Sequence, residues 1–266
     1  MTAEDGRAGA TPELIVHRDA QVLAQAVAAR LVTKLVDVLA ARDEAHLALT
    51  GGSVGIGSLA AVAELPARVA VDWKRVHLWW SDERFLPEGD PERNVTQARE
   101  ALLDKLDLDP AFVHAMPSTD GPDGNDAEAA AERYAAELAR YAAPDSDVPE
   151  FDVELFGMGP DGHVASLFPE HPGVYEEEPS VIPVHNSPKP PPDRLSFTFR
   201  TIRSAREAWI VAAGGEKAAA AHMALSGGGR VQVPAAGARG NVRTLWLIDR
   251  ACAADLPPGL NRLASP

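Results

Sequence analysis

The stretch that decides the fold is Phe151–Pro169, FDVELFGMGPDGHVASLFP, near the middle of the chain. Its apolar run Phe151–Phe156 predicts a buried strand, and the glycines and proline of Gly157–Pro160 predict a turn. An acid and an imidazole, Asp161 and His163, follow the turn, and the apolar residues after them predict a short helical start. α/β proteins commonly present catalytic groups at such junctions, at the carboxyl end of a sheet. The same spacing also fits a plain strand-to-helix turn with a surface histidine.

The composition indicates a folded domain with a substantial core. Of the 266 residues, 45% are hydrophobic and 24% are charged, which argues against global disorder. We expect one domain over residues 13–256 and a flexible N-terminal tail over residues 1–12. The net charge of −14 argues against a nucleic-acid binder. An anionic small substrate would need a local cluster of cations and backbone N–H groups.

The chain has one cysteine, Cys252, which excludes an internal disulfide framework and a multi-cysteine zinc site. No apolar run reaches the length of a membrane span, and the first residues lack the apolar core of a signal peptide. We therefore expect a cytoplasmic protein that does not bind membranes. We also expect a monomer or weak homo-oligomer. His46 and His77 fall in predicted strands, which favours structural roles, and no histidine pair has metal-ligand spacing on one helix.

Strand and helix patterns alternate along the chain. Apolar runs predict strands at 13–17, 46–50, 75–81, 113–116, 151–156, 181–184, 195–199, 209–213 and 243–248. Helical spacing and start signals predict helices at 20–41, 54–63, 94–106, 127–141, 218–225 and 249–254, with Asp19 and Asn94 as N-caps for the first and third. This alternation predicts a single α/β domain with a mostly parallel, Rossmann-like sheet flanked by helices.

A glycine turn joins the second predicted strand to its helix. Gly51, Gly52 and Ser53 place free N–H groups and the positive end of a helix dipole where an anion can bind. A rival interpretation is the dinucleotide fingerprint, which Gly55–Ala60 formally satisfies. The acid expected about 20 residues later is poorly matched, so we favour a site for a phosphate group.

Four cations are candidates for the same site. Arg84 follows the third predicted strand and should project from the same sheet edge as the glycine turn. Lys189 and Arg194 belong to the proline-rich segment SPKPPPDR, which is stiff and extended. Lys217 lies in the first turn of a helix, where the dipole disfavours a cation unless it serves an anion. Arg84, Lys189 and Arg194 could instead be ordinary solvated cations.

Taken together, these motifs resemble the 6-phosphogluconolactonases, in family order from about Leu14 to Asp249. The motifs are TGGS at 50–53, Asp82-Glu83-Arg84 with Asn94, GMGPDGHVASLFP at 157–169, SPKPPPDR at 187–194 and GGEK at 214–217. The resemblance implies a one-domain, glucosamine-phosphate-isomerase-like fold. It also implies hydrolysis of 6-phosphoglucono-1,5-lactone to 6-phosphogluconate in the oxidative pentose phosphate pathway, without a metal or an organic cofactor.

The family's catalytic histidine corresponds to His163. The substrate and phosphate contacts implied by the resemblance are Gly51, Gly52, Ser53, Arg84, Lys189, Arg194 and Lys217. Lactone hydrolysis needs a base for water and a proton for the leaving ring oxygen, and one histidine can supply both. Asp161 could fix the imidazole tautomer or hold the water.

Two other functions fit parts of this pattern. A glucosamine-6-phosphate deaminase of the same fold would be expected to read D-G-H-I-A-F-N-E-P after the glycines, but this chain has Ser166-Leu167-Phe168-Pro169 there. The deaminase would also have Tyr at the position of Arg84. A non-catalytic sugar-phosphate sensor would keep the cations but would not need the base. The presence of both Asp161 and His163 argues against the sensor.

Overall fold

A parallel sheet forms the centre of the molecule, in a computed structural model that describes residues 11–142, 144–257, 260 and 262–264. Seven strands pair in parallel in the order β10-β1-β9-β8-β5-β2-β3. They are β1 (Glu13–His17), β2 (Ala45–Leu49), β3 (Val76–Trp80), β5 (Val153–Gly157), β8 (Glu207–Ala212), β9 (Arg243–Asp249) and β10 (Arg262–Ala264). The strands β2, β3, β5 and β8 are buried almost throughout, as in sheets covered on both faces. The predicted α/β class is confirmed.

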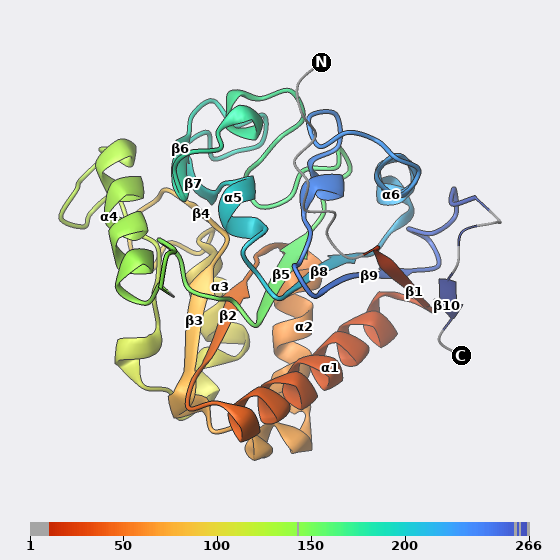
Figure 1. The fold of residues 1–266 in the computed structure, drawn as a ribbon, viewed down its shortest axis with the longest axis horizontal. Coiled ribbons are helices and arrows are strands. Elements are labelled where there is room, and N and C mark those ends of the chain that lie inside the picture. The colour runs from red at the N-terminus through yellow and green to blue at the C-terminus, as the bar shows by residue number, and fades with distance from the viewer. Residues whose placement is uncertain (1–10, 143, 258–259, 261, 265–266) are drawn as a thin grey trace.

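Two long helices cover one face of the sheet, and a smaller sheet with further helices lies on the other side (Figure 1). The first face holds α1 (Ala20–Ala41) and α2 (Gly52–Glu64). Asp19 caps α1 as predicted, accepting a hydrogen bond from the Val22 N–H at 2.9 Å. The other elements are antiparallel β4 (Asp82–Arg84), β7 (Arg194–Phe197) and β6 (Val181–Val184), with α4 (Ala127–Arg140), α5 (Phe199–Ile202) and α6 (Ala218–Leu225).

Several short elements differ from the prediction. The helix expected over residues 94–106 is α3 (Asn94–Ala101), which packs against α2 and β4, followed by a separate 3₁₀ turn. The strand expected at residues 113–116 is a single bridge between Val113 and Leu78. Residues 249–254 form turns instead of a helix, because β9 continues through Asp249 and its carboxylate accepts the N–H of Cys252 at 2.8 Å.

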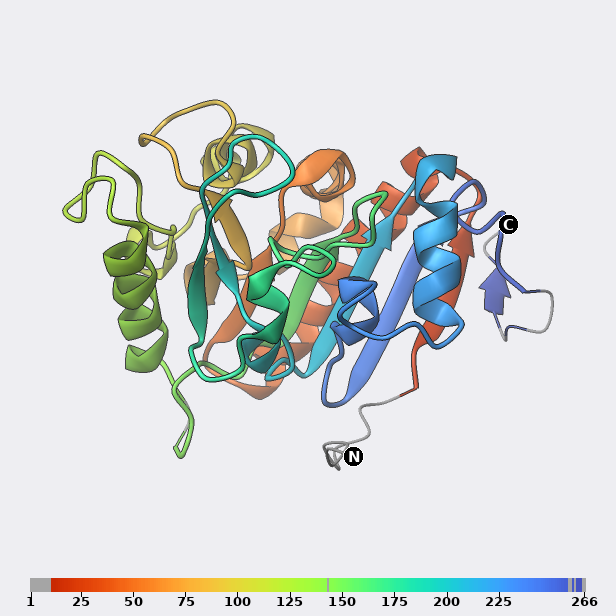
Figure 2. The same ribbon diagram turned by 90° about the horizontal axis from the view of Figure 1, so that it is seen from above.

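The sheet also extends beyond residue 256, where we expected the domain to end. The strand β10 pairs with β1 at the edge of the sheet, and Figure 2 shows it in dark blue beside the red first strand. Residues 1–10 of the predicted tail lie outside the described residues. No helix in the described ranges is long and apolar enough to cross a membrane.

One buried acid in the central strand makes a testable contribution to stability. Glu154 in β5 is fully buried between Ala48 and Ala208 of the neighbouring strands. Neither of its carboxyl oxygens has a hydrogen-bond partner in the described part of the chain. Burial raises the pKa of Glu154 well above its usual value, because the ionised form is poorly solvated there. The unfolded chain therefore loses this proton at a lower pH than the folded protein does.

We expect Glu154→Gln to stabilise the protein relative to the wild type increasingly as the pH rises above 5. The pKa of Glu154 is higher in the folded protein than in the unfolded chain. Its contribution to stability is therefore fully present below the pKa of the unfolded chain, and it is lost as the pH rises through the pKa of the folded protein. The difference should grow by up to about 1.4 kcal/mol per pH unit. Urea unfolding at pH 5, 6, 7 and 8 measures it, with Glu100→Gln at an exposed position as the control. A constant difference between the two curves would contradict this expectation.

Candidate active site

The predicted site residues gather in one cavity at the carboxyl ends of the central strands. The cavity has a volume of about 270 Å³. It lies where the chain order reverses, because β2 is followed outward by β3 whereas β5 is followed by β8 in the other direction, a usual place for ligands in open α/β sheets. Among its lining residues are Gly51, Gly52, Ser53, Arg84, His163, Lys189, Arg194 and Lys217. The remaining predicted residue, Asp161, contacts His163 directly.

Asp161 and His163 form a closely hydrogen-bonded pair. The distance between Asp161 Oδ1 and His163 Nδ1 is 2.5 Å, so a proton must lie between them, and Nδ1 donates to the carboxylate. In a neutral imidazole the other nitrogen, Nε2, is then a free acceptor. Burial alone would raise the pKa of Asp161, but its hydrogen bond with His163 and the nearby charges of His163 and Lys189 hold that pKa below its usual range. The arrangement is that of an oriented general base.

The loop that carries this pair is held by backbone contacts and not by a helix. The Gly159 N–H donates to the His163 carbonyl at 3.1 Å, and Val164 and Leu167 form a bridge across a tight turn. The predicted helical start after His163 is therefore wrong. The N–H of Ser166, which a helix would use internally, instead donates to the Ser196 hydroxyl at 3.1 Å.

Gly159 leaves the space that the Asp161–His163 pair occupies. A Cβ atom built at this position would lie 2.1 Å from His163 Nδ1 and 2.4 Å from Asp161 Oδ1. We expect Gly159→Ala to displace the imidazole and lower kcat about a hundredfold, because misplacing a catalytic group by 1 Å costs about that much. Steady-state kinetics measure this effect, with Gly57→Ala, at a helical position where a Cβ would meet no other atom within 4 Å, as the control. Equal kcat values in the two variants would contradict it.

The glycine turn after β2 forms one wall of the cavity. Gly51 precedes α2, and a Cβ there would lie 1.9 Å from Asn94 Oδ1, so glycine is needed for the Asn94 side chain to pack against the turn. The N–H groups of Gly52 and Ser53 lie in the first turn of α2, at the positive end of the helix dipole. The dinucleotide interpretation is not supported, because Gly55–Ala60 lies inside α2 and not before it.

Arg84 reaches the cavity from the smaller sheet. We expected it to follow the strand at 75–81 and to project from the edge of the same sheet, but the chain changes sheets at Ser81. The Ser81 carbonyl accepts the Phe197 N–H at 2.8 Å. Arg84 therefore lies in β4, directly opposite Arg194 of β7. Its Nη1 donates to the Glu92 carbonyl at 2.5 Å, and its buried Nε has no partner among the described residues. This leaves Arg84 with donors for an anion.

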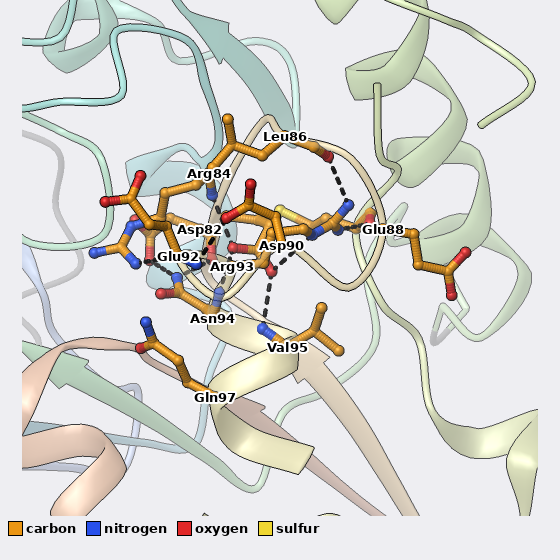
Figure 3. A network of polar contacts seen from close by, with 12 residues as sticks. Asp82, Arg84, Leu86, Glu88, Asp90, Glu92, Arg93, Asn94, Val95 and Gln97 are labelled. Carbon is orange, nitrogen blue, oxygen red and sulfur yellow. Dashed lines mark hydrogen bonds and ion pairs between the residues drawn. The ribbon is translucent and has the colours of Figure 1, made fainter. Parts of the chain in front are cut away.

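A buried acid fixes the position of Arg84. Glu83 is fully buried and accepts hydrogen bonds from the N–H groups of Arg84, Asn94 and Val95 at 2.6–2.9 Å. It also lies 3.6 Å from the buried guanidinium of Arg93, which donates to two loop carbonyls (Figure 3). Burial raises the pKa of Glu83, and Arg93 and the N–H donors oppose that rise. The residue at the N-cap position of α3 is Arg93, not Asn94 as predicted. The first N–H groups of the helix bond to the Glu83 carboxylate instead of to a capping side chain.

The other predicted cations differ in their surroundings. Arg194 is 5% exposed, and its Nε and Nη2 donate to the carbonyls of Lys189, Pro190 and Pro191 at 2.9–3.2 Å. Lys217 lies in the 3₁₀ turn Gly215–Lys217 before α6, and its ammonium has no polar partner in the described ranges. Lys217 is therefore available to a ligand, whereas most of the donors of Arg194 are already used.

Three of the further residues that line the cavity have polar side chains and were not predicted as site residues. They are Thr50, Asp82 and Asn94. Asp82 is 6% exposed and accepts a hydrogen bond from Ser166 Oγ at 2.7 Å. The Asn94 amide donates to the Asp82 carbonyl at 2.8 Å. The sequence signal for both was their place in the Asp-Glu-Arg motif and at the start of the next helix.

Three side chains of the types that bind metals lie close together at the other end of the strands from the cavity. The ligand atoms of Glu44, His46 and His77 lie within 4.8 Å of one another, at the amino ends of β2 and β3. Trp79 Nε1 donates to His46 Nδ1 at 3.2 Å, so the proton of a neutral His46 is on Nε2 and that nitrogen offers no lone pair. The His46 and His77 rings stack with centroids 4.4 Å apart. We assign these histidines to the core, as their strand positions predicted.

The fold and the cavity define an α/β protein with a histidine–carboxylate pair facing a cluster of cations. The family model described as glucosamine-6-phosphate isomerases/6-phosphogluconolactonase matches residues 18–246, and the chain belongs to this family. A 6-phosphogluconolactonase from Streptomyces coelicolor is 62% identical over 257 residues, which cover 96% of this chain and 98% of that protein.

Two further relatives extend the comparison. The 6-phosphogluconolactonase of Mycobacterium tuberculosis is 46% identical over 242 residues, which cover 91% of this chain and 97% of that protein. The solved structure of 6-phosphogluconolactonase from Trypanosoma brucei superposes with a TM-score of 0.78 at 26% identity, covering 92% of this chain and 99% of that one. The chain therefore resembles these proteins over nearly its whole length.

Proposed function

We propose that this protein hydrolyses 6-phospho-D-glucono-1,5-lactone to 6-phospho-D-gluconate, as the names of its relatives indicate for them. The observation that supports this most is the free Nε2 of His163, held by Asp161, in the same cavity as Arg84 and Lys217. A base and a remote phosphate site are the two elements that this substrate requires. We place the reaction in the oxidative pentose phosphate pathway on the strength of the same resemblance.

In the proposed mechanism, His163 acts first as a base and then as an acid. Nε2 takes a proton from water while the water oxygen attacks the lactone carbonyl carbon. The tetrahedral intermediate then collapses, the bond between that carbon and the ring oxygen breaks, and Nε2 returns the proton to the leaving oxygen. Asp161 holds the imidazole and stabilises its transient positive charge. The phosphate binds remotely, so its binding energy positions the lactone against the base.

The test is a pH-stat assay with fresh 6-phosphogluconolactone beside unphosphorylated gluconolactone. The expected result is acid release accelerated by the protein for the phosphorylated lactone and scarcely for the other, because the cations select the phosphate. Release of ammonia from glucosamine 6-phosphate would favour the deaminase. Binding of 6-phosphogluconate without any acceleration would favour the sensor, and either result would overturn the proposal.

We expect Arg84→Ala to raise KM for the phosphorylated lactone roughly tenfold to a hundredfold, because a charge-assisted phosphate contact contributes about 1.5–3 kcal/mol. The effect on kcat should be smaller, since Arg84 does not touch the Asp161–His163 pair. The measurement is steady-state kinetics, with Arg99→Ala on the exposed face of α3 as the control. An unchanged KM would remove Arg84 from the phosphate site.

A further inference from the structure

Two lysines line the cavity, and they differ in what they touch. The Lys189 ammonium lies 3.5 Å from Asp161 Oδ1 and 3.3 Å from His163 Nδ1. The Lys217 ammonium makes no polar contact within the described ranges, although it lines the same cavity. Their sequence motifs suggested the same role for both, as contacts of the substrate phosphate. The geometry separates them.

The contact of Lys189 is with the carboxylate. An ammonium group can only donate, and His163 Nδ1 already uses its proton in the 2.5 Å bond to Asp161. Asp161 Oδ1 is therefore the acceptor for both neighbours. The side chains of Lys189 and Asp161 are 39% and 34% exposed, so the contact lies at the rim of the cavity, on the side of the imidazole away from Nε2.

We propose that Lys189 is a positioning residue of the Asp161–His163 pair and not a ligand of the substrate phosphate. It keeps the carboxylate ionised and the imidazole in the tautomer that presents Nε2 to the substrate. This inference rests on the proposed function, and it assigns to Lys189 a role different from that of Lys217.

A buried arginine fixes the loop that carries Lys189. Arg194 donates to the carbonyls of Lys189, Pro190 and Pro191, and Ser187 Oγ donates to the Lys189 carbonyl at 2.9 Å. The Arg194 guanidinium also lies 5.7 Å from the centre of the Phe168 ring, which packs 4.7 Å from the His163 ring. Lys189 and His163 are thus held by two buried side chains that contact each other, Arg194 and Phe168, as a preorganised site requires.

Removing the charge of Lys189 should change when the pair takes up a proton. The pKa of Asp161 is held low by His163 and Lys189 against the effect of burial. The other charged or titratable groups on the surrounding elements are Asp82, Arg84, Arg194, His171 and Lys217. None of these is within hydrogen-bond distance of Asp161 in the described structure, so Lys189 is the cation that acts on it most directly. Without Lys189, the pair should bind its extra proton at higher pH.

The experiment compares Lys189→Met with Lys189→Arg and with the matched variant Lys217→Met. In Lys189→Met the acid limb of the kcat/KM profile should move up by about one pH unit, and Lys189→Arg should restore it. The affinity for 6-phosphogluconate should change less than about threefold in Lys189→Met and about tenfold or more in Lys217→Met. Lys217→Met should raise KM without moving the acid limb.

A second measurement does not depend on lactone hydrolysis. The imidazole ¹⁵N signals of His163 are followed against pH in the wild type and in Lys189→Met, without substrate. A midpoint that rises in the variant supports the inference even if the wild type proves inactive on the lactone, which would count against the proposed function alone. An unmoved midpoint overturns the inference, and so does a loss of 6-phosphogluconate affinity in Lys189→Met that matches the loss in Lys217→Met.

Discussion

His163→Ala is expected to lower kcat for lactone hydrolysis roughly a thousandfold, within the range for loss of a general base. The substitution removes Nε2, the acceptor that the 2.5 Å bond to Asp161 leaves free for water. The phosphate contacts remain, so the affinity for 6-phosphogluconate should change little. The rate is measured by pH-stat with fresh lactone, and uncatalysed hydrolysis is subtracted because activated esters open unaided.

Asp161→Asn is the matched variant for this prediction. An asparagine can accept from Nδ1 or donate to it, so it no longer imposes one tautomer, and its activity should lie between those of the wild type and His163→Ala. If His163→Ala hydrolyses the lactone at nearly the full rate, His163 is not the base. If it instead loses affinity for 6-phosphogluconate together with activity, the imidazole contributes to binding and the proposed division of roles is wrong.

The main elements of the fold could be predicted from sequence because they bury continuous apolar runs. The strand over residues 153–157 and the helix over residues 20–41 have patterns set by their own residues. The elements that were mispredicted depend on distant partners. β10 forms only by pairing with β1. At Ser81 the chain passes from the central sheet to the smaller one, where the Ser81 carbonyl accepts a hydrogen bond from the Phe197 N–H. No local pattern encodes these pairings.

The candidate site shows the same division. The residues Asp161 and His163 were found because an acid and an imidazole follow a strand through glycines, and the cations because they accompany glycine or proline motifs. The buried residues that hold these side chains in place were not predicted. Glu83 of β4 contacts Asn94 of α3, which lies 11 residues later in the sequence. Arg93 contacts Glu83, which lies 10 residues earlier. In the sequence, both look like ordinary solvated charges. Their burial comes from tertiary packing, which turns surface-like residues into a structural network.

Glu83→Ala is expected to destabilise the protein by about 3–5 kcal/mol, the usual cost of removing one partner of a buried ion pair. The alanine leaves the Arg93 guanidinium buried at 1% exposure without its anion. It also leaves three backbone N–H groups without their acceptor, including the first two of α3. Such a loss is a large fraction of the stability of a typical domain. Urea unfolding followed by circular dichroism measures it.

The double variant Glu83→Gln with Arg93→Met separates the ion pair from the helix cap. Because neither side chain is then charged, its destabilisation should be smaller than the sum for the two single variants. The glutamine oxygen can still accept one of the N–H groups, so α3 should remain folded and Arg84 should keep part of its affinity for phosphate. Strictly additive effects would mean that Glu83 and Arg93 act independently. In that case the position of Arg84 would depend on the backbone hydrogen bonds of Glu83 alone.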